Sequence, residues 1–208
     1  MNGQNPDIER FNRWSASYDQ SVFQRLFFGP VQRTVLSMAD LQSEPATIVD
    51  VGCGTGRLLR SAKERWPTAR LIGVDPSEGM IEIARKLNPH AEFYIAPAEA
   101  IPLADVSVDL AFSTISFHHW SNQLGGIREI ARILRPGGCF ILADQIADQN
   151  TPIWIRMLFS VLHSFHRSTP RLSEIQKMFE VSGLQIIRQN RISFGLVAMV
   201  AGIRNDVG

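Results

Sequence analysis

Short apolar segments alternate with helix-length segments along the middle of this chain, and this alternation limits the folds that the chain can adopt. Strands are predicted at residues 47–51, 70–74, 92–95, 107–112 and 138–143. Helices are predicted between them, at residues 57–66, 77–87 and 122–134. Strands that are joined through helices form parallel βαβ units, and the resulting sheet is covered on both faces. The pattern therefore predicts an α/β fold with a doubly wound, mostly parallel sheet.

Helices are also predicted on both sides of this core. Two of them, at residues 6–18 and 22–40, precede the first strand. A third, at residues 151–166, begins with Thr151-Pro152, a capping hydroxyl followed by a proline at the first helical position. This third helix carries more apolar side chains than one core-facing stripe needs. It could be buried against the sheet and the first helices, line an apolar substrate pocket as a lid, or contact a second copy or a membrane surface.

The last part of the chain predicts a helix and a hairpin. Ser173 and Gln176 have the spacing of a capping box, which satisfies exposed amide donors at a helix start. This helix should end near Gly183, because glycine tolerates the left-handed conformation that caps a helix. Strands at residues 184–192 and 195–203 follow, and their short link predicts an antiparallel pair.

The length of 208 residues fits a single domain. We divide it into a helical leader, a cofactor-binding core, a helical insertion, and a C-terminal helix with its hairpin, at residues 1–44, 45–144, 145–170 and 171–208. The net charge of +1 argues against a broad nucleic-acid or anionic-membrane surface. The longest nearly apolar run, residues 194–203, is shorter than the about 20 residues that a membrane span needs. We therefore expect a cytoplasmic protein, as a monomer or a homodimer, without stable membrane insertion.

The most informative stretch follows the first strand and reads Ile48-Val-Asp-Val-Gly-Cys-Gly-Thr-Gly-Arg57. Glycine lets the chain turn sharply and approach a ligand, and the helix behind the turn presents its positive end. The spacing G-x-G-x-G differs from the dinucleotide pattern G-x-G-x-x-G. Asp50 would gain little beside a pyrophosphate, but it would form a charge-assisted contact with an ammonium group. The loop therefore favours S-adenosylmethionine, whose tail carries an ammonium group, over a nicotinamide dinucleotide.

A second acidic residue, Asp75, ends the second predicted strand. A carboxylate at this position can accept both hydroxyls of a ribose. Dehydrogenases share this feature, so Asp75 indicates a nucleoside without identifying the cofactor. Its alternative role is to cap the helix predicted at residues 77–87.

Four motifs follow one another in the core: Val49-Asp-Val-Gly-Cys-Gly-Thr-Gly56, Gly73-Val-Asp-Pro-Ser-Glu-Gly-Met80, Ala98-Glu-Ala-Ile-Pro-Leu103 and Leu134-Arg-Pro-Gly-Gly138. In this order they resemble class I S-adenosylmethionine-dependent methyltransferases. Among these, the chain is similar to the small-molecule group related to ubiquinone and menaquinone biosynthesis methyltransferases. An aromatic leader, Phe11-Asn-Arg-Trp-Ser-Ala-Ser-Tyr-Asp19, adds to the resemblance. It implies a Rossmann-like, seven-stranded sheet with an antiparallel last strand.

The resemblance also implies a role for each residue that matches the family. It implies that the methionine end of the cofactor is held by Asp50, Gly52, Cys53, Gly54 and Gly56, with Ser113 beneath it and Tyr18 closing over it. It further implies that Asp75 holds the ribose and that the adenine is contacted by Pro76, Met80, Ala98 and Glu99. The family often has an aspartate before the alanine of the third motif, whereas this chain has Pro97, which offers neither a carboxylate nor a donor.

Methyl transfer from a sulfonium is an in-line displacement, in which the enzyme mainly positions the reacting groups. A hydroxyl or ammonium acceptor also needs a base. The candidates for such a base follow the fourth strand, in Ser116-Phe-His-His-Trp120, and end the fifth, in Asp144-Gln145. We select His118 as the catalytic candidate because histidine titrates near neutral pH. Its alternative role is cofactor packing or helix entry, and Trp120 is expected in the core.

These observations predict a methyltransferase that acts on a small, hydrophobic or aromatic molecule, with S-adenosylhomocysteine as its product. Two alternatives are a catalytically silent module that binds the same cofactor and, with less support, a nicotinamide-dependent oxidoreductase. Cys53 and Cys139 are too few for arsenic methylation or a disulfide framework, and without nearby histidines they do not form a zinc site. No metal and no nucleic-acid partner are therefore predicted.

Overall fold

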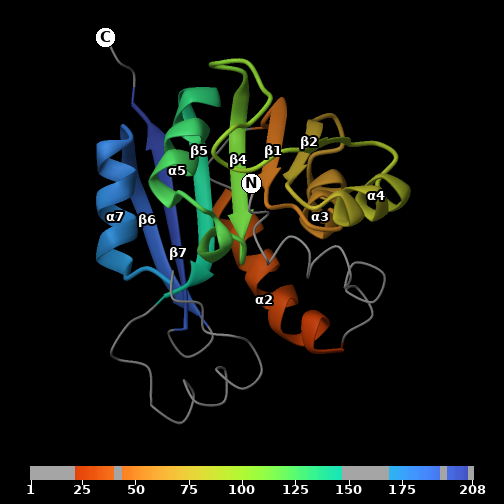
Figure 1. Ribbon diagram of the computed structural model, residues 1–208, viewed down its shortest axis with the longest axis horizontal. Coiled ribbons are helices and arrows are strands. Elements are labelled where there is room, and N and C mark those ends of the chain that lie inside the picture. Colours follow the sequence, from red (N-terminus) through yellow and green to blue (C-terminus); the bar gives the residue numbers. More distant parts are fainter. Residues whose placement is uncertain (1–21, 40–43, 147–168, 193–195, 206–208) are drawn as a thin grey trace, which may run out of the picture.

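The computed structural model describes residues 22–39, 44–146, 169–192 and 196–205. These residues build one seven-stranded sheet in the order β3-β2-β1-β4-β5-β7-β6 (Figure 1). Neighbouring strands from β3 to β5 pair in parallel, whereas β7 is antiparallel to both β5 and β6. The predicted Rossmann-like sheet with its antiparallel last strand is confirmed, as is the predicted C-terminal hairpin.

The helices and strands lie close to the predicted ranges. The strands are β1 (Thr47–Val51), β2 (Arg70–Asp75), β3 (Glu92–Ile95), β4 (Val108–Thr114), β5 (Leu134–Gln145), β6 (Leu184–Ile192) and β7 (Val197–Arg204). The helices are α2 (Val22–Met38), α3 (Arg57–Arg65), α4 (Glu78–Leu87), α5 (Gln123–Ile133) and α7 (Leu172–Val181), with a short 3₁₀ helix η2 (Phe117–His119). The helices predicted at residues 6–18 and 151–166 lie outside the described residues.

Alternate side chains of the central strands enter two separate hydrophobic clusters, one on each face of the sheet. Ile48 of β1 and Leu110 of β4 pack with residues of α2, α3 and α4. Val49 and Ala111, the next residues along the same strands, pack with residues of α5 and α7 on the other face. All five residues of β1 are buried, as expected for a parallel strand that is covered on both sides. Both faces being covered, ligands can reach the sheet at the ends of its strands.

Two local predictions are wrong: the start of β5 and the capping pair of α7. β5 begins at Leu134 rather than at Gly138, because Leu134 pairs with Val108 before the register shifts and Cys139 resumes pairing with β4. The helix α7 begins at Leu172, and its capping carboxylate is that of Glu174, which accepts the N–H of Arg171 at 2.7 Å.

The predicted capping pair of Ser173 and Gln176 therefore does not form. The side chain of Gln176 instead donates to the amide oxygen of Gln189 on β6, at 3.1 Å. A glutamine that faces a neighbouring strand has a partner that spacing along the chain cannot reveal.

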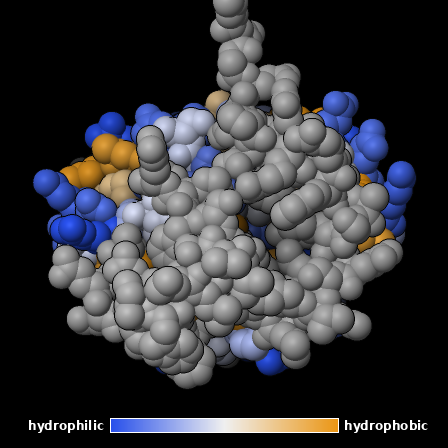
Figure 2. Space-filling model, turned by 60° about the horizontal axis from the view of Figure 1, so that its bottom comes forward, coloured by the Kyte–Doolittle hydropathy of each residue, from blue (hydrophilic) through white to orange (hydrophobic). Residues whose placement is uncertain are grey.

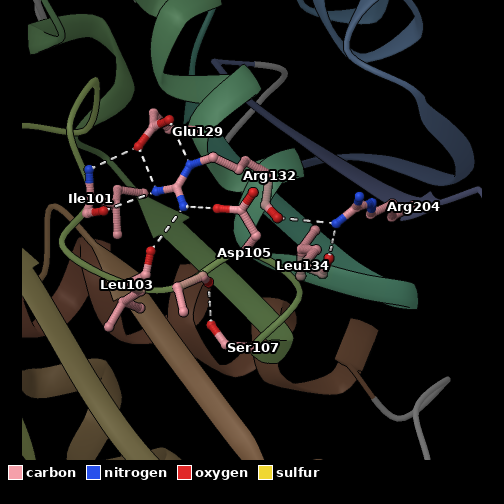
Figure 3. A network of polar contacts seen from close by, with 9 residues as sticks. Ile101, Leu103, Asp105, Ser107, Glu129, Arg132, Leu134 and Arg204 are labelled. Atoms are coloured by element: carbon pink, nitrogen blue, oxygen red, sulfur yellow. Dashed lines mark hydrogen bonds and ion pairs between the residues drawn. The ribbon is translucent and has the colours of Figure 1, made fainter.

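A network around Arg132 fastens the loop before β4 to α5 (Figure 3). The guanidinium of Arg132 donates to the carbonyl oxygens of Ile101 at 3.0 Å and Leu103 at 2.9 Å. It also pairs with the carboxylates of Glu129 at 2.8 Å and Asp105 at 2.5 Å. The network lies where β4 and β5 begin, at the end of the sheet opposite to the glycine loop.

Candidate functional site

The glycine loop and both predicted acidic residues meet where β1, β2 and β4 end. The backbone N–H groups of Gly52 and Cys53 both donate to the carbonyl of Val74 in β2, at 2.7 and 3.1 Å. The N–H of Gly54 donates to the Asp75 carboxylate at 2.9 Å. The loop amides of residues 52–54 are thus engaged within the fold and do not form a cluster of donors for an anion.

The three glycines of the loop have different reasons to be glycine. A Cβ on Gly52 would lie 2.2 Å from the Oγ of Ser116, and one on Gly56 would lie 2.6 Å from the amide nitrogen of Asn88. These two positions are filled by the protein itself. A Cβ on Gly54, whose φ is +52°, would meet nothing within 4 Å. Gly54 therefore borders open space at the surface of the loop.

Asp50 is buried on β1 with a side chain that the fold does not satisfy. It is 1% exposed, and its Oδ1 has no hydrogen-bond partner among the described residues. Burial, together with the nearby charge of Asp75, raises its pKa to about 8. A buried carboxylate oxygen without a donor is unfavourable. Asp50 is therefore suited to a cationic or proton-donating ligand group.

Asp75 is held by the backbone on two sides. Its Oδ1 accepts the N–H of Ser77 and its Oδ2 accepts the N–H of Gly54, each at 2.9 Å. Burial raises its pKa to about 6, although these two hydrogen bonds act in the opposite direction. The alternative role predicted for Asp75, to cap α4, belongs to Ser77, which is the N-cap and whose Oγ accepts the N–H of Met80 at 3.2 Å. Each Asp75 oxygen retains a second lone pair for a ligand.

The loop after β4 contacts the glycine loop through Ser116, which was not among the residues predicted to bind the cofactor. The Oγ of Ser116 donates to the carbonyl of Val51 at 3.1 Å and is hydrogen-bonded to the buried Ser113 hydroxyl at 2.8 Å. Ile115, directly before Ser116, has a φ of +51°, which is strained for a β-branched residue. Strained residues of this kind occur at functional sites. Predicting this contact requires knowing that β4 pairs with β1.

Of the residues predicted to contact adenine, Pro76 directly follows β2, Met80 lies in α4, and Ala98 and Glu99 follow β3. Met80 and Ala98 are buried, and Pro76 is partly exposed. The Glu99 carboxylate accepts the N–H of Asn122, the N-cap of α5, at 2.7 Å, so it has a structural partner as well. Tyr18, predicted to close over the cofactor, lies outside the described residues.

Another residue missing from the predicted site supports the glycine loop from below. Asn88 is fully buried, and its amide donates to the carbonyl of Thr55 at 3.1 Å and to that of Ala84 at 2.8 Å. It thereby connects the end of α4 to the loop. An asparagine thirty-odd residues downstream gives no signal in the sequence that it belongs to this loop.

Neither cysteine has the properties of a nucleophile. Burial, with added repulsion from Asp75 and Asp50, raises the pKa of Cys53 far above its ordinary value. Burial raises the pKa of Cys139 to about 12. Since the thiolate is the reactive form, both thiols are inert near neutral pH.

The predicted catalytic candidate His118 lies in η2 and is 5% exposed. Its Nδ1 is 2.6 Å from the Oδ1 of Asp144 at the end of β5. Trp120, which follows η2, packs edge-to-face on Phe117 with ring centroids 5.0 Å apart, as its predicted core role requires. The structure thus joins the two candidate regions for a base, after β4 and at the end of β5, into one buried pair.

Within the described residues, no group of three or more His, Cys, Asp or Glu side chains is placed to hold a metal ion. Nor does that part of the chain contain a helix long and apolar enough to cross a bilayer. Figure 2 brings the lower end of the molecule in Figure 1 forward and shows both hydrophilic and hydrophobic described residues along its flanks.

The chain belongs to the class I S-adenosylmethionine-dependent methyltransferases. Its sheet, with an antiparallel seventh strand between the fifth and sixth, is the one that the resemblance implied. Residues 49–142 match the family model described as a methyltransferase domain. S-adenosylmethionine is the cofactor of this class, and the unpartnered Asp50 oxygen and the open space at Gly54 fit such a ligand.

Individual relatives and solved structures agree with this class. The chain is 37% identical over 153 residues to malonyl-[acyl-carrier protein] O-methyltransferase of Hahella chejuensis, covering 70% of this chain and 53% of that one. It is 35% identical over 103 residues to demethylmenaquinone methyltransferase of Chlorobaculum parvum, covering 50% and 42%. The chain thus spans about half the length of these curated relatives.

Among solved structures, the chain resembles the methyltransferase in a complex with the Trm112 methyltransferase activator from Haloferax volcanii. The TM-score is 0.80 at 22% identity, covering 94% of this chain and 97% of the other. At this identity the likeness supports the fold alone.

Proposed function

We propose that this protein transfers a methyl group from S-adenosylmethionine to a small apolar or aromatic acceptor. The observation that carries the proposal is the buried Asp50 carboxylate, whose Oδ1 has no partner among the described residues and which lies on β1 just before the loop in which Gly54 borders open space. The ammonium group of the cofactor's methionine end is the partner that such an oxygen needs.

In this proposal the methionine end lies against the loop of residues 52–56, with Ser113 and Ser116 beneath it. The engaged amides of Gly52, Cys53 and Gly54 support this assignment. A nicotinamide dinucleotide would place an anionic pyrophosphate there, where it needs unengaged N–H donors. The loop therefore favours the sulfonium cofactor over the nicotinamide alternative.

The ribose is assigned to Asp75. Its two oxygens are fixed in orientation by the N–H groups of Gly54 and Ser77, and each can still accept one ribose hydroxyl. Pro76 and Met80 follow directly, so we place the adenine between them and the segment at Ala98 and Glu99. Tyr18 keeps its proposed place over the tail.

Bound S-adenosylmethionine supplies an activated methyl group, and the chain's contribution is to hold the acceptor in line with it and to exclude water. Inert Cys53 and Cys139 leave no route through a methylated thiol. Two curated relatives are named for malonyl and quinone acceptors, which are small organic molecules or groups. The quinone relative supports a small apolar acceptor for this chain, whereas the malonyl relative is named for an acceptor group carried on a protein.

Calorimetric titration with S-adenosylhomocysteine and with NADH tests the cofactor. We expect S-adenosylhomocysteine to bind and NADH to fail. Gly54→Val should abolish binding, because its side chain would occupy the open space that we assign to the cofactor. Gly183→Val is the matched control, since Gly183 also has a left-handed φ, of +77°, and an open Cβ position, but caps α7 far along the chain.

Both variants carry the backbone strain of a β-branched residue in the left-handed region, so only the loss specific to Gly54 reports on the ligand. Equal S-adenosylhomocysteine affinity in folded Gly54→Val and wild type would refute the site. Binding without turnover of any acceptor would favour the catalytically silent module instead.

A further inference from the structure

Asp144 is the most heavily engaged carboxylate of the described residues near the proposed site. It is the second-last residue of β5, in the buried part of the strand, and has no exposed surface. Its Oδ2 accepts the N–H groups of Phe117 at 2.6 Å and His118 at 3.3 Å. Its Oδ1 faces the Nδ1 of His118 at 2.6 Å and also accepts the N–H of Gln145 at 2.6 Å.

This set of contacts determines which nitrogen of His118 carries the proton. Three of the four contacts are backbone N–H donors, so the Asp144 carboxylate is the acceptor in each of them. With a carboxylate that accepts from three N–H groups, the Nδ1 of His118 is the fourth donor. The neutral ring is therefore the Nδ1–H tautomer, and its Nε2 is the atom with a basic lone pair. A proton gained at Nε2 leaves a cation that Asp144 stabilises at contact distance.

The position of η2 places this pair beside the proposed methyl donor. Ser116, two residues before His118, fills the space next to Gly52, where a Cβ would be 2.2 Å from its Oγ. The N–H of Ile115 donates to the carbonyl of Ala143, so the same loop is also tied to β5 just before Asp144. His118 is thus held between the glycine loop and the end of β5.

We propose that the His118–Asp144 pair is a general base, and that the acceptor is therefore a proton-bearing oxygen nucleophile, a hydroxyl or phenol, rather than a carboxylate. This inference rests on the proposed function and specifies its substrate class. Asp144 acts through His118 as a positioning residue. A carboxylate acceptor is already ionised at neutral pH and needs no base, so a buried carboxylate–histidine pair has no role in its methylation.

The acceptor oxygen forms a bond to the methyl carbon, the bond between this carbon and sulfur breaks, and its electron pair stays on sulfur as a neutral thioether. The hydroxyl proton passes to the Nε2 of His118. The imidazolium, paired with Asp144, then releases the proton to solvent. The titratable groups that face His118 among the described contacts are Asp144 from β5 and His119, whose ring centroid is 4.0 Å away.

The competing explanation is that Asp144 only holds the loop after β4, through its bonds to the N–H groups of Phe117 and His118. Two conservative variants separate the explanations. Asp144→Asn keeps an oxygen for these amides but removes the charge that stabilises an imidazolium. His118→Asn keeps a donor toward Asp144 but lacks the basic nitrogen. His119→Asn is the matched control on the adjacent residue.

The first measurement uses S-adenosylhomocysteine as the only ligand. Nitrogen NMR of the histidine side chains in the S-adenosylhomocysteine complex should show neutral His118 protonated at Nδ1, with this preference lost in Asp144→Asn. All three variants should bind S-adenosylhomocysteine within about twofold of wild type, because none removes a cofactor contact. A wild-type His118 protonated at Nε2 would overturn the proposal. Failure of wild type to bind S-adenosylhomocysteine would instead reject the proposed function.

The second measurement follows S-adenosylhomocysteine release with pairs of ring compounds that carry either a phenol or a carboxylic acid. We expect turnover of phenols, and a fall in kcat of about 10²–10⁴-fold in His118→Asn and Asp144→Asn. The fall should shrink along a series of phenols of decreasing pKa, because a phenolate needs no base. Turnover of carboxylates alone or of neither class, or an equal loss for every phenol in the series, would overturn the proposal.

Discussion

The Asp75 carboxylate accepts the backbone N–H of Gly54 at 2.9 Å, so the end of β2 holds the turn that follows β1. The same carboxylate accepts the N–H of Ser77 at the start of α4. One side chain thereby orients the glycine loop, the first turn of a helix and, in our proposal, the cofactor ribose. Both oxygens of Asp75 are thus oriented by backbone N–H groups.

Asp75→Asn should weaken S-adenosylhomocysteine binding at least tenfold. The variant keeps the size of the side chain but loses charge-assisted hydrogen bonds to the ribose, which contribute roughly 1.5–3 kcal/mol each before water compensates. Calorimetry measures the loss. The control ligand is S-adenosylhomocysteine without ribose hydroxyls, which should bind wild type and Asp75→Asn equally. If the variant still prefers the complete ligand as strongly as wild type does, Asp75 does not hold the ribose.

The stability of the protein without cofactor should fall as the pH rises from about 5 to about 7. Burial raises the pKa of Asp50 to about 8 and that of Asp75 to about 6, above the unfolded value of about 3.9. Between the folded and unfolded pKa values the folded state binds more protons, so raising the pH favours unfolding. Asp50 alone should contribute a slope of up to about 1.4 kcal/mol per pH unit.

Denaturant titrations at several pH values measure this slope, and Asp50→Asn should flatten it. Binding of S-adenosylhomocysteine should have the opposite pH dependence, since its ammonium group pairs with ionised Asp50. Affinity should therefore rise over the same range in wild type and stay level in Asp50→Asn. A wild-type slope that survives in Asp50→Asn would show that other groups cause it.

Ile115 should be one of the rare positions where glycine is better than alanine. At most positions in strands and helices glycine is less stable than alanine by roughly 0.5–1 kcal/mol. The φ of +51° at Ile115 reverses this order, because the left-handed region costs a side-chain-bearing residue about 1–2 kcal/mol. Chemical unfolding should therefore find Ile115→Gly more stable than Ile115→Ala.

Ile203 provides the comparison for this pair. It is partly buried against the same hydrophobic cluster but lies in the regular part of β7, opposite Cys139. Ile203→Ala should be more stable than Ile203→Gly. The same order at both positions would mean that the backbone at Ile115 is not strained.

Arg132→Met should lower the free energy of unfolding by about 2–3 kcal/mol without changing S-adenosylhomocysteine affinity. The guanidinium satisfies the carbonyls of Ile101 and Leu103, which would lose charge-assisted donors of roughly 1.5–3 kcal/mol each, discounted here for partial exposure. Arg135→Met is the control. Its ion pair with Asp109 is exposed, so its loss should cost less than about 1 kcal/mol. Equal losses in the two variants would contradict a special role for the Arg132 network (Figure 3).

The sequence by itself determined the features that depend on neighbouring residues. Alternating strands and helices predicted the sheet, because apolar strands that are buried on both faces and joined by helices have few other solutions. The glycine spacing, with Asp50 and Asp75 at the ends of β1 and β2, predicted the cofactor site, because parallel strands bring their carboxyl ends to one edge. The residues of this predicted site, from Asp50 to Asp75, lie within the single βαβ unit of β1, α3 and β2.

Only the tertiary structure decided which distant side chains complete the site. Ser116 fills the space at Gly52, Asn88 supports Thr55, and Asp144 contacts the Nδ1 of His118. Ser116 and Asn88 are each more than 30 residues from their partners in the loop. Their contacts exist because β1 pairs with both β2 and β4, and that order of strands is a property of the folded sheet. Gln176 likewise does not form its predicted cap. Its side chain contacts Gln189 on β6, a residue that the local sequence pattern of the helix does not include.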